Sequence, residues 1–175
     1  MKLQIVAAGL VLLVAACAAR SAETTPASET IRVVAPSEIA AGAYLAEVGG
    51  CHDCHTPGWA QTGGQVPEDQ LLVGVPVGFS GPWGTSYAAN LRLAVQGTDA
   101  SDWADTMKHR TGLPPMPWST VNHMSRDDLM AIHAYLSALG PGGEVMPMAV
   151  TDGSAPLTPY IWFDPLGPET HPAAP

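Results

Sequence analysis

The sequence predicts an all-α domain whose helices are joined by long loops rich in glycine and proline. Three segments carry helix-start and helix-stop signals, and the stretches between them lack a sustained hydrophobic period. The longest of these stretches, residues 56–96, has 41 residues and is too long for a structureless loop in a compact domain. We therefore expect a bound group to organise it.

Each predicted helix follows a residue that can cap its N-terminus. The third helix is the clearest, because it carries an apolar stripe at helical spacing and ends at Gly140-Pro141. The helices are expected over residues 38–48, 102–110 and 126–139, after the capping residues Ser37, Ser101 and Ser125. We expect the first helix to cross the third, with Gly42 and Ala46 allowing Tyr135 and Leu136 to approach closely.

The N-terminus has the layout of an export signal rather than of a core helix. Lys2 precedes an apolar run over residues 3–14, and small residues follow it. Cys17 lies in Val14-Ala15-Ala16-Cys17, which resembles the lipobox of bacterial lipoproteins, so we expect Cys17 to carry a lipid. Cleavage after Ala18, or an uncleaved anchor, are the alternatives.

The chain divides into four parts. The export signal covers residues 1–17, a Pro-punctuated linker covers 18–36, and the folded domain covers 37–141. The remainder, 142–175, is a proline-rich strap. Residues 160–163 within it are too apolar for a free tail, so we expect them to lie against the domain.

The net charge of −9 argues against nucleic-acid binding, which needs a basic face. An acidic exported protein either stays soluble by self-repulsion or meets a basic partner.

The chemistry of the chain centres on Cys51, Cys54 and His55. Two cysteines three positions apart could form a disulfide, a metal site or a haem attachment site. Cys-x-x-Cys-His is the signature of covalent haem, because two thiols on one turn can reach both vinyl groups of a porphyrin while the adjacent imidazole ligates the iron. A zinc site would need a second Cys or His pair, and a thioredoxin-like site a βαβ context. We therefore expect one haem c.

Around this motif the sequence resembles the single-haem cytochrome c domains of bacterial periplasmic electron transport. The resemblance covers about residues 38–141 and implies a small all-α cytochrome c fold that wraps one haem. Two residues depart from the family pattern: His52 stands where Asn or another residue is commoner, and Arg92 where Thr is frequent. The matching motifs are Gly42-x-Tyr44-Leu45, Gly50-Cys51-His52-Asp53-Cys54-His55-Thr56-Pro57, Gly84-x-x-Tyr87-x-x-Asn90-Leu91, Met116-Pro117-Trp118 and Asp128-Leu129-x-Ala131-Ile132-x-Ala134-Tyr135-Leu136.

Met116 is the expected sixth ligand of the iron. It lies in Pro114-Pro115-Met116-Pro117-Trp118, where the prolines fix the backbone and exclude a helix. In the resembling family the Met of a Met-Pro pair between the last two helices is the distal ligand. His123 is the main rival, whereas we expect the other candidate methionines to pack in the core: Met107, Met124 and Met130.

Two further side-chain roles are expected. A buried haem propionate would need donors, which Trp83 or Tyr87 could supply. We expect His52 to point out of the attachment turn into solvent.

These features predict an electron carrier rather than an enzyme. Its iron, held by His55 and Met116, would cycle between the ferric and ferrous states. The resemblance implies redox protein partners, with a membrane-associated dehydrogenase or oxidase among them. It also implies that the protein is located on the periplasmic side of the membrane. A small haem enzyme, a haem sensor or an electron-accepting subunit of an oxidoreductase complex are the alternatives.

Overall fold

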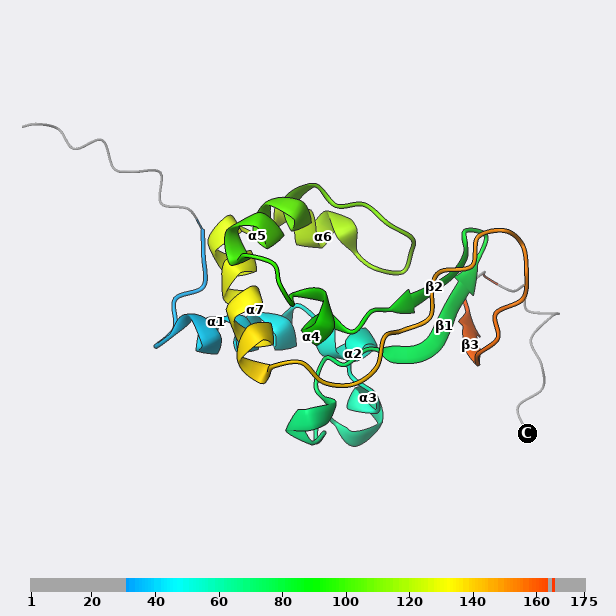
Figure 1. Cartoon of the computed structure of the whole chain (residues 1–175), viewed down its shortest axis with the longest axis horizontal. Coiled ribbons are helices and arrows are strands. Elements are labelled where there is room, and N and C mark those ends of the chain that lie inside the picture. The colour runs from blue at the N-terminus through cyan, green and yellow to red at the C-terminus, as the bar shows by residue number, and fades with distance from the viewer. Residues whose placement is uncertain (1–30, 164, 166–175) are drawn as a thin grey trace, which may run out of the picture.

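The computed structural model describes residues 31–163 and 165, and Figure 1 shows how they are arranged. The export signal, Cys17 and linker residues 18–30 lie outside the described residues, as do residue 164 and residues 166–175 of the strap. In chain order the elements are α1 (Glu38–Val48), α2 (Cys51–His55), α3 (Trp59–Thr62), the 3-10 helix η1 (Glu68–Gln70), β1 (Val75–Gly81), β2 (Gly84–Ala88), α4 (Leu91–Ala94), α5 (Ala100–His109), α6 (Trp118–His123), α7 (Arg126–Leu139) and β3 (Tyr160–Trp162).

The prediction of an all-α fold is wrong, because the chain combines its helices with a three-stranded mixed sheet. β1 pairs antiparallel with β2, and β3 lies parallel to β1 on its other edge, which gives the order β2-β1-β3. Pro76 and the glycines of β1 weaken its strand pattern. Segment 56–96 is therefore organised by its own secondary structure, which includes α3, η1, the β1–β2 hairpin and α4.

The crossing of the first and last long helices is confirmed. α1 packs across α7 in Figure 1, and the two helices share a hydrophobic core. A Cβ atom added to Gly42 would lie 1.9 Å from the carbonyl oxygen of Ala131 and 2.8 Å from the Cβ of Tyr135. Only glycine therefore fits at this crossing without moving a helix. The buried members of the core are Ala41, Leu45, Ala46, Leu72, Val95, Ala131, Ile132 and Leu136.

Two of the three predicted caps form. The side chain of Ser37 accepts a hydrogen bond from the backbone N–H of Ala40 at 3.1 Å, and Ser125 accepts one from that of Asp128 at 3.1 Å. The second long helix, α5, begins earlier than expected, because Asp99 caps it by accepting from the N–H of Ser101 at 2.8 Å.

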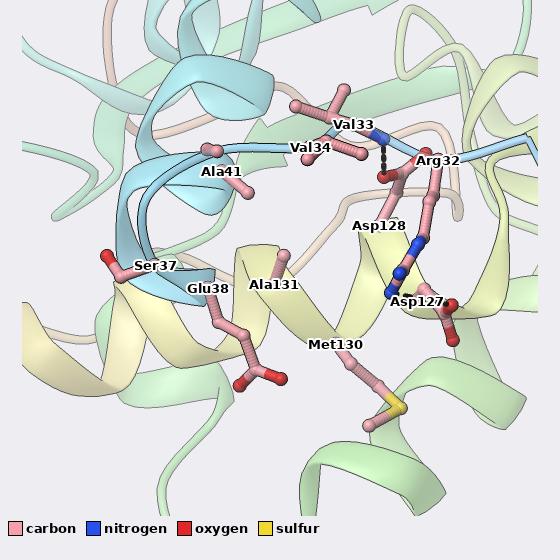
Figure 2. Close-up of a pocket in the computed structure, with 11 residues that line it drawn as sticks. Arg32, Val33, Val34, Ser37, Glu38, Ala41, Asp127, Asp128, Met130 and Ala131 are labelled. Carbon is pink, nitrogen blue, oxygen red and sulfur yellow. Dashed lines mark hydrogen bonds and ion pairs between the residues drawn. The ribbon is translucent and has the colours of Figure 1, made fainter.

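Residues 31–36 of the predicted linker are held against α7 (Figure 2). The N–H of Val33 donates to the carboxylate of Asp128 at 2.7 Å, and Arg32 lies 3.6 Å from Asp127. Both side chains of this ion pair are more than half exposed, so the pair stabilises the fold by no more than about 1 kcal/mol. A cavity of about 240 Å³ lies between this segment, α1 and α7, but neither the Cys-x-x-Cys-His motif nor Met116 lines it. The residues around this cavity therefore hold the N-terminal segment against α7.

Side-chain amide and guanidinium groups fasten the strap where it leaves α7. The amide of Asn90 donates to the carbonyl oxygens of Gly142 and Glu144 at 2.7 and 3.1 Å. Arg92, which is 7% exposed, donates to the carbonyls of Gly140 and Leu139 at 2.6 and 2.5 Å. A buried cation at the negative end of α7 is stabilised by the helix dipole. Arg92 is thus a structural residue of the α7 C-terminus.

Within the described ranges, no helix is both long and apolar enough to span a bilayer.

Candidate functional site

The Cys-x-x-Cys-His motif forms the short helix α2, which follows α1 almost directly. Gly50 makes the sharp turn between the two helices with φ +70°, a conformation that glycine adopts without strain. Cys51 and Cys54 lie three positions apart on α2, and both are half-buried free thiols. This local geometry places both sulfurs on one turn, as the motif predicts.

His55 is buried, with 7% of its surface exposed, and its ring is held by one hydrogen bond. Nδ1 lies 2.7 Å from the carbonyl oxygen of Ala89. Because a carbonyl only accepts, Nδ1 carries the proton and Nε2 keeps its lone pair. Burial lowers the pKa of His55, although the bond to Ala89 opposes this shift, so the imidazole is neutral. A neutral imidazole with a fixed tautomer is ready to ligate a metal through Nε2.

The backbone around His55 is fixed from both sides. The carbonyl oxygen of His55 accepts from the N–H of Gly74 at 2.8 Å, and Thr56 Oγ1 accepts from the N–H of Leu72 at 2.8 Å. Leu72 is fully buried and has φ +58°, an unusual conformation for a bulky residue. Its carbonyl in turn accepts from the N–H of Leu91 at 3.0 Å. Segments 72–74 and 89–91 therefore clamp the end of α2, and strain at Leu72 accompanies this clamp.

The two thiols are protonated rather than activated. Burial raises the pKa of both Cys51 and Cys54 above the usual thiol range, and the nearby Asp53 carboxylate adds to the effect. Redox and nucleophilic cysteines need the opposite shift, toward the thiolate. The raised pKa values therefore favour thiols that are modified permanently, and they argue against thiols that alternate between reduced and oxidised forms.

His52 is buried, so the prediction that it is solvated is wrong. It is 3% exposed, its ring stacks on Trp59 with centroids 4.1 Å apart, and Nδ1 lies 2.8 Å from Thr56 Oγ1. Burial lowers its pKa. His52 therefore links α3 to the motif helix. The sequence alone does not reveal this role, because the stacking on Trp59 depends on the fold.

An apolar pocket of about 170 Å³ lies beside Cys54. Strands β1 and β3 form one wall of it, and α2 and α3 form the other. The wall from the sheet consists of Val75, Val77, Phe79 and Ile161. The sequence missed this wall, because the two strands that build it were not predicted.

Met116 lies in the loop between α5 and α6 and is half-buried. Ser86 Oγ donates to the carbonyl of Pro114 at 2.5 Å, so the loop is attached to β2. Ala89, which holds His55, lies three residues further along the same segment, or about 10 Å in an extended chain. Segment 86–89 thus contacts both the loop that carries Met116 and the ring of His55.

The other candidate ligands have structural partners. Met107, Met124 and Met130 contact the core cluster around Ala104 and Leu129, in agreement with the packing interpretation. Nδ1 of His123 lies 2.5 Å from the carbonyl of Ser119, within its own helix. Residues 31–163 contain no group of three or more His, Cys, Asp or Glu side chains that could hold a metal ion.

The aromatic residues beside the hairpin are already engaged with the protein. Trp83 Nε1 donates to the carbonyl of Phe79 at 3.3 Å, whereas Tyr87 Oη accepts from Thr158 at 3.0 Å and keeps its own proton as a donor.

Trp118 follows the Met116 loop, and its buried Nε1 has no partner among the described residues. The guanidinium of Arg110 lies 5.2 Å from the Trp118 ring centroid.

The donor set fits a covalently attached haem. Two protonated thiols lie on one turn, the adjacent imidazole presents an unprotonated Nε2, and an apolar pocket adjoins one thiol. Searches of family models, of curated proteins and of solved structures each found no match to the chain.

Proposed function

We propose that this chain is a one-haem c-type cytochrome that carries electrons between proteins. Cys51 and Cys54 would form the two thioether bonds, His55 would be the proximal ligand and Met116 the distal one. The haem supplies an iron that cycles between ferric and ferrous forms. The observation that carries the proposal is the hydrogen bond from His55 Nδ1 to the carbonyl of Ala89, 2.7 Å long and adjacent to two free thiols.

The chain's own residues contribute orientation and surroundings. Ala89 fixes the His55 tautomer, and a hydrogen bond to the second ring nitrogen also raises the basicity of the ligating one. Thr56, Leu72 and Gly74 hold the backbone of the motif in place. Phe79 and Ile161 give the pocket beside Cys54 an apolar wall.

The segment over residues 1–17 supports export to the periplasmic side of the membrane, with a lipid on Cys17 as the anchor. The net charge of −9 supports a basic redox protein as partner.

Spectroscopy of the ferric protein, purified from a strain that matures cytochromes c, tests the carrier function. A low-spin, six-coordinate iron that exchanges electrons with another redox protein is the expected result. A high-spin iron that turns over a small substrate without a protein partner would instead identify an enzyme.

A further inference from the structure

Strand β3 and the residue after it expose four consecutive large apolar side chains. Tyr160, Ile161, Trp162 and Phe163 are 52%, 50%, 52% and 44% exposed. We call these residues the β3 patch. Side chains alternate along a strand, so Ile161 and Phe163 lie on the same face as Phe79, whereas Tyr160 lies on the other face, against Gly78, together with Trp162. The four side chains thus flank one exposed edge of the sheet, and exposed apolar surface of this kind often marks an interaction site.

The β3 patch is held in place by the backbone. Ile161 is paired with Phe79 of β1, and the N–H of Phe163 donates to the carbonyl of Ser80 at 2.8 Å. The Phe163 ring also packs on Phe79 and Trp83, with centroids 5.8 and 6.3 Å apart. A surface that is ordered before binding loses little entropy when a partner docks. The strand ends the sheet at the edge opposite β2 (Figure 1).

One face of the patch, the face that carries Ile161, adjoins the surroundings of Cys54. Ile161 belongs to the patch and also lines the pocket against Cys54, together with its strand partner Phe79. A protein that docks along the edge of β3 and covers Ile161 would therefore lie next to the thiol that, in the proposed function, bonds the edge of the haem.

The charges along this part of the chain have one sign. The sequence has no Lys or Arg over residues 33–91 and none after Arg126. Asp53 lines the pocket beside Cys54, and Asp152 lies on the strap between the bridge at Val150 and β3. Arg92, the cation nearest in sequence to the hairpin, is buried on backbone carbonyls. A partner that complements this face must combine apolar groups with positive charge.

We propose that the β3 patch is the docking surface for a basic redox protein, which exchanges electrons at the Cys54 side of the site. This inference rests on the proposed function, because only a haem at Cys54 gives the surface an electron to exchange.

Stopped-flow electron transfer from the reduced protein to a lysine-rich mitochondrial-type cytochrome c tests the surface. Tyr160→Ala and Tyr44→Ala form a matched pair, because the two tyrosines are 52% and 54% exposed and Tyr44 lies on α1. We expect Tyr160→Ala and Trp162→Ala to slow the second-order rate about fivefold or more, and Tyr44→Ala to change it less than about twofold. Hexaammineruthenium(III), a small cationic oxidant, senses charge but cannot use an apolar docking surface, so its rate should stay the same in all three variants.

Three results separate the possibilities. Equal rates for Tyr160→Ala and Tyr44→Ala, with an unchanged haem spectrum, would overturn the docking surface while leaving the carrier function intact. Sedimentation that shows a dimer which Trp162→Ala dissociates would assign the patch to a second copy of the chain and overturn the inference. A wild-type protein without covalent haem would overturn the proposed function itself. Asp152→Asn, which keeps the apolar patch, should reduce the dependence of the rate on salt.

Discussion

Replacing Gly42 by alanine tests the packing that supports the site. The added Cβ would lie 1.9 Å from the carbonyl oxygen of Ala131, whereas ordinary contacts of this kind are 3.4 Å or longer. A backbone oxygen cannot rotate away, so α1 and α7 must separate by more than an ångström. Overpacking of this kind costs about 3 kcal/mol, and the higher helix propensity of alanine returns about 1 kcal/mol. The expected net loss is about 2 kcal/mol of unfolding free energy.

The assay is thermal and denaturant unfolding, followed by far-ultraviolet circular dichroism. A loss of about 2 kcal/mol should lower the melting temperature by roughly 8 °C in a domain of this size. Ala43→Gly, one position further along α1, serves as the control, because it changes helix propensity by about 1 kcal/mol without adding a contact. If Gly42→Ala is as stable as the wild type, α1 and α7 do not approach each other closely at Gly42.

Three further outcomes are expected. Met116→Ala should remove the sulfur-to-iron charge-transfer band and lower the reduction potential, whereas Met124→Ala should do neither; a band that survives in Met116→Ala would exclude Met116 as the ligand. Leu72→Ala should lower the unfolding free energy, measured in denaturant, by about 3 kcal/mol because Leu72 is fully buried; a loss below about 1 kcal/mol would contradict its place in the core. Mass spectrometry of the mature N-terminus should find a lipid on Cys17, and a chain that begins at Ala19 would show ordinary cleavage instead.

Local signals predicted the helical part of the fold. Ser37 and Ser125 cap the helices that the sequence assigns to them, and the small residue Gly42 lies at the crossing with α7. These features depend on residues a few positions apart, or on a periodic apolar face. The sheet depends instead on the pairing of Phe79 with Ile161, which are far apart in the chain. No local pattern in β1 or in the strap reveals this pairing.

The candidate site likewise has features that the local sequence predicts and features that depend on distant residues. Cys51, Cys54 and His55 are adjacent in sequence, so their placement on one helical turn follows from the motif. The bond between His55 and Ala89 spans 34 positions and uses a backbone carbonyl, which any residue carries, so nothing in the sequence points to it. The burial of His52 depends on Trp59 and Thr56 folding back over α2. Its place on the attachment turn alone suggested solvent exposure.

Covalent attachment of haem at Cys51 and Cys54, as proposed, is tested most directly by denaturing gel electrophoresis with haem staining, together with the intact mass. Wild-type protein from a strain that matures cytochromes c should keep its stain after denaturation and carry the added mass of one haem. Cys51→Ala combined with Cys54→Ala should lose both signals. An unstained wild-type band at the mass of the bare polypeptide would show that the chain holds no covalent haem and would contradict the proposed function.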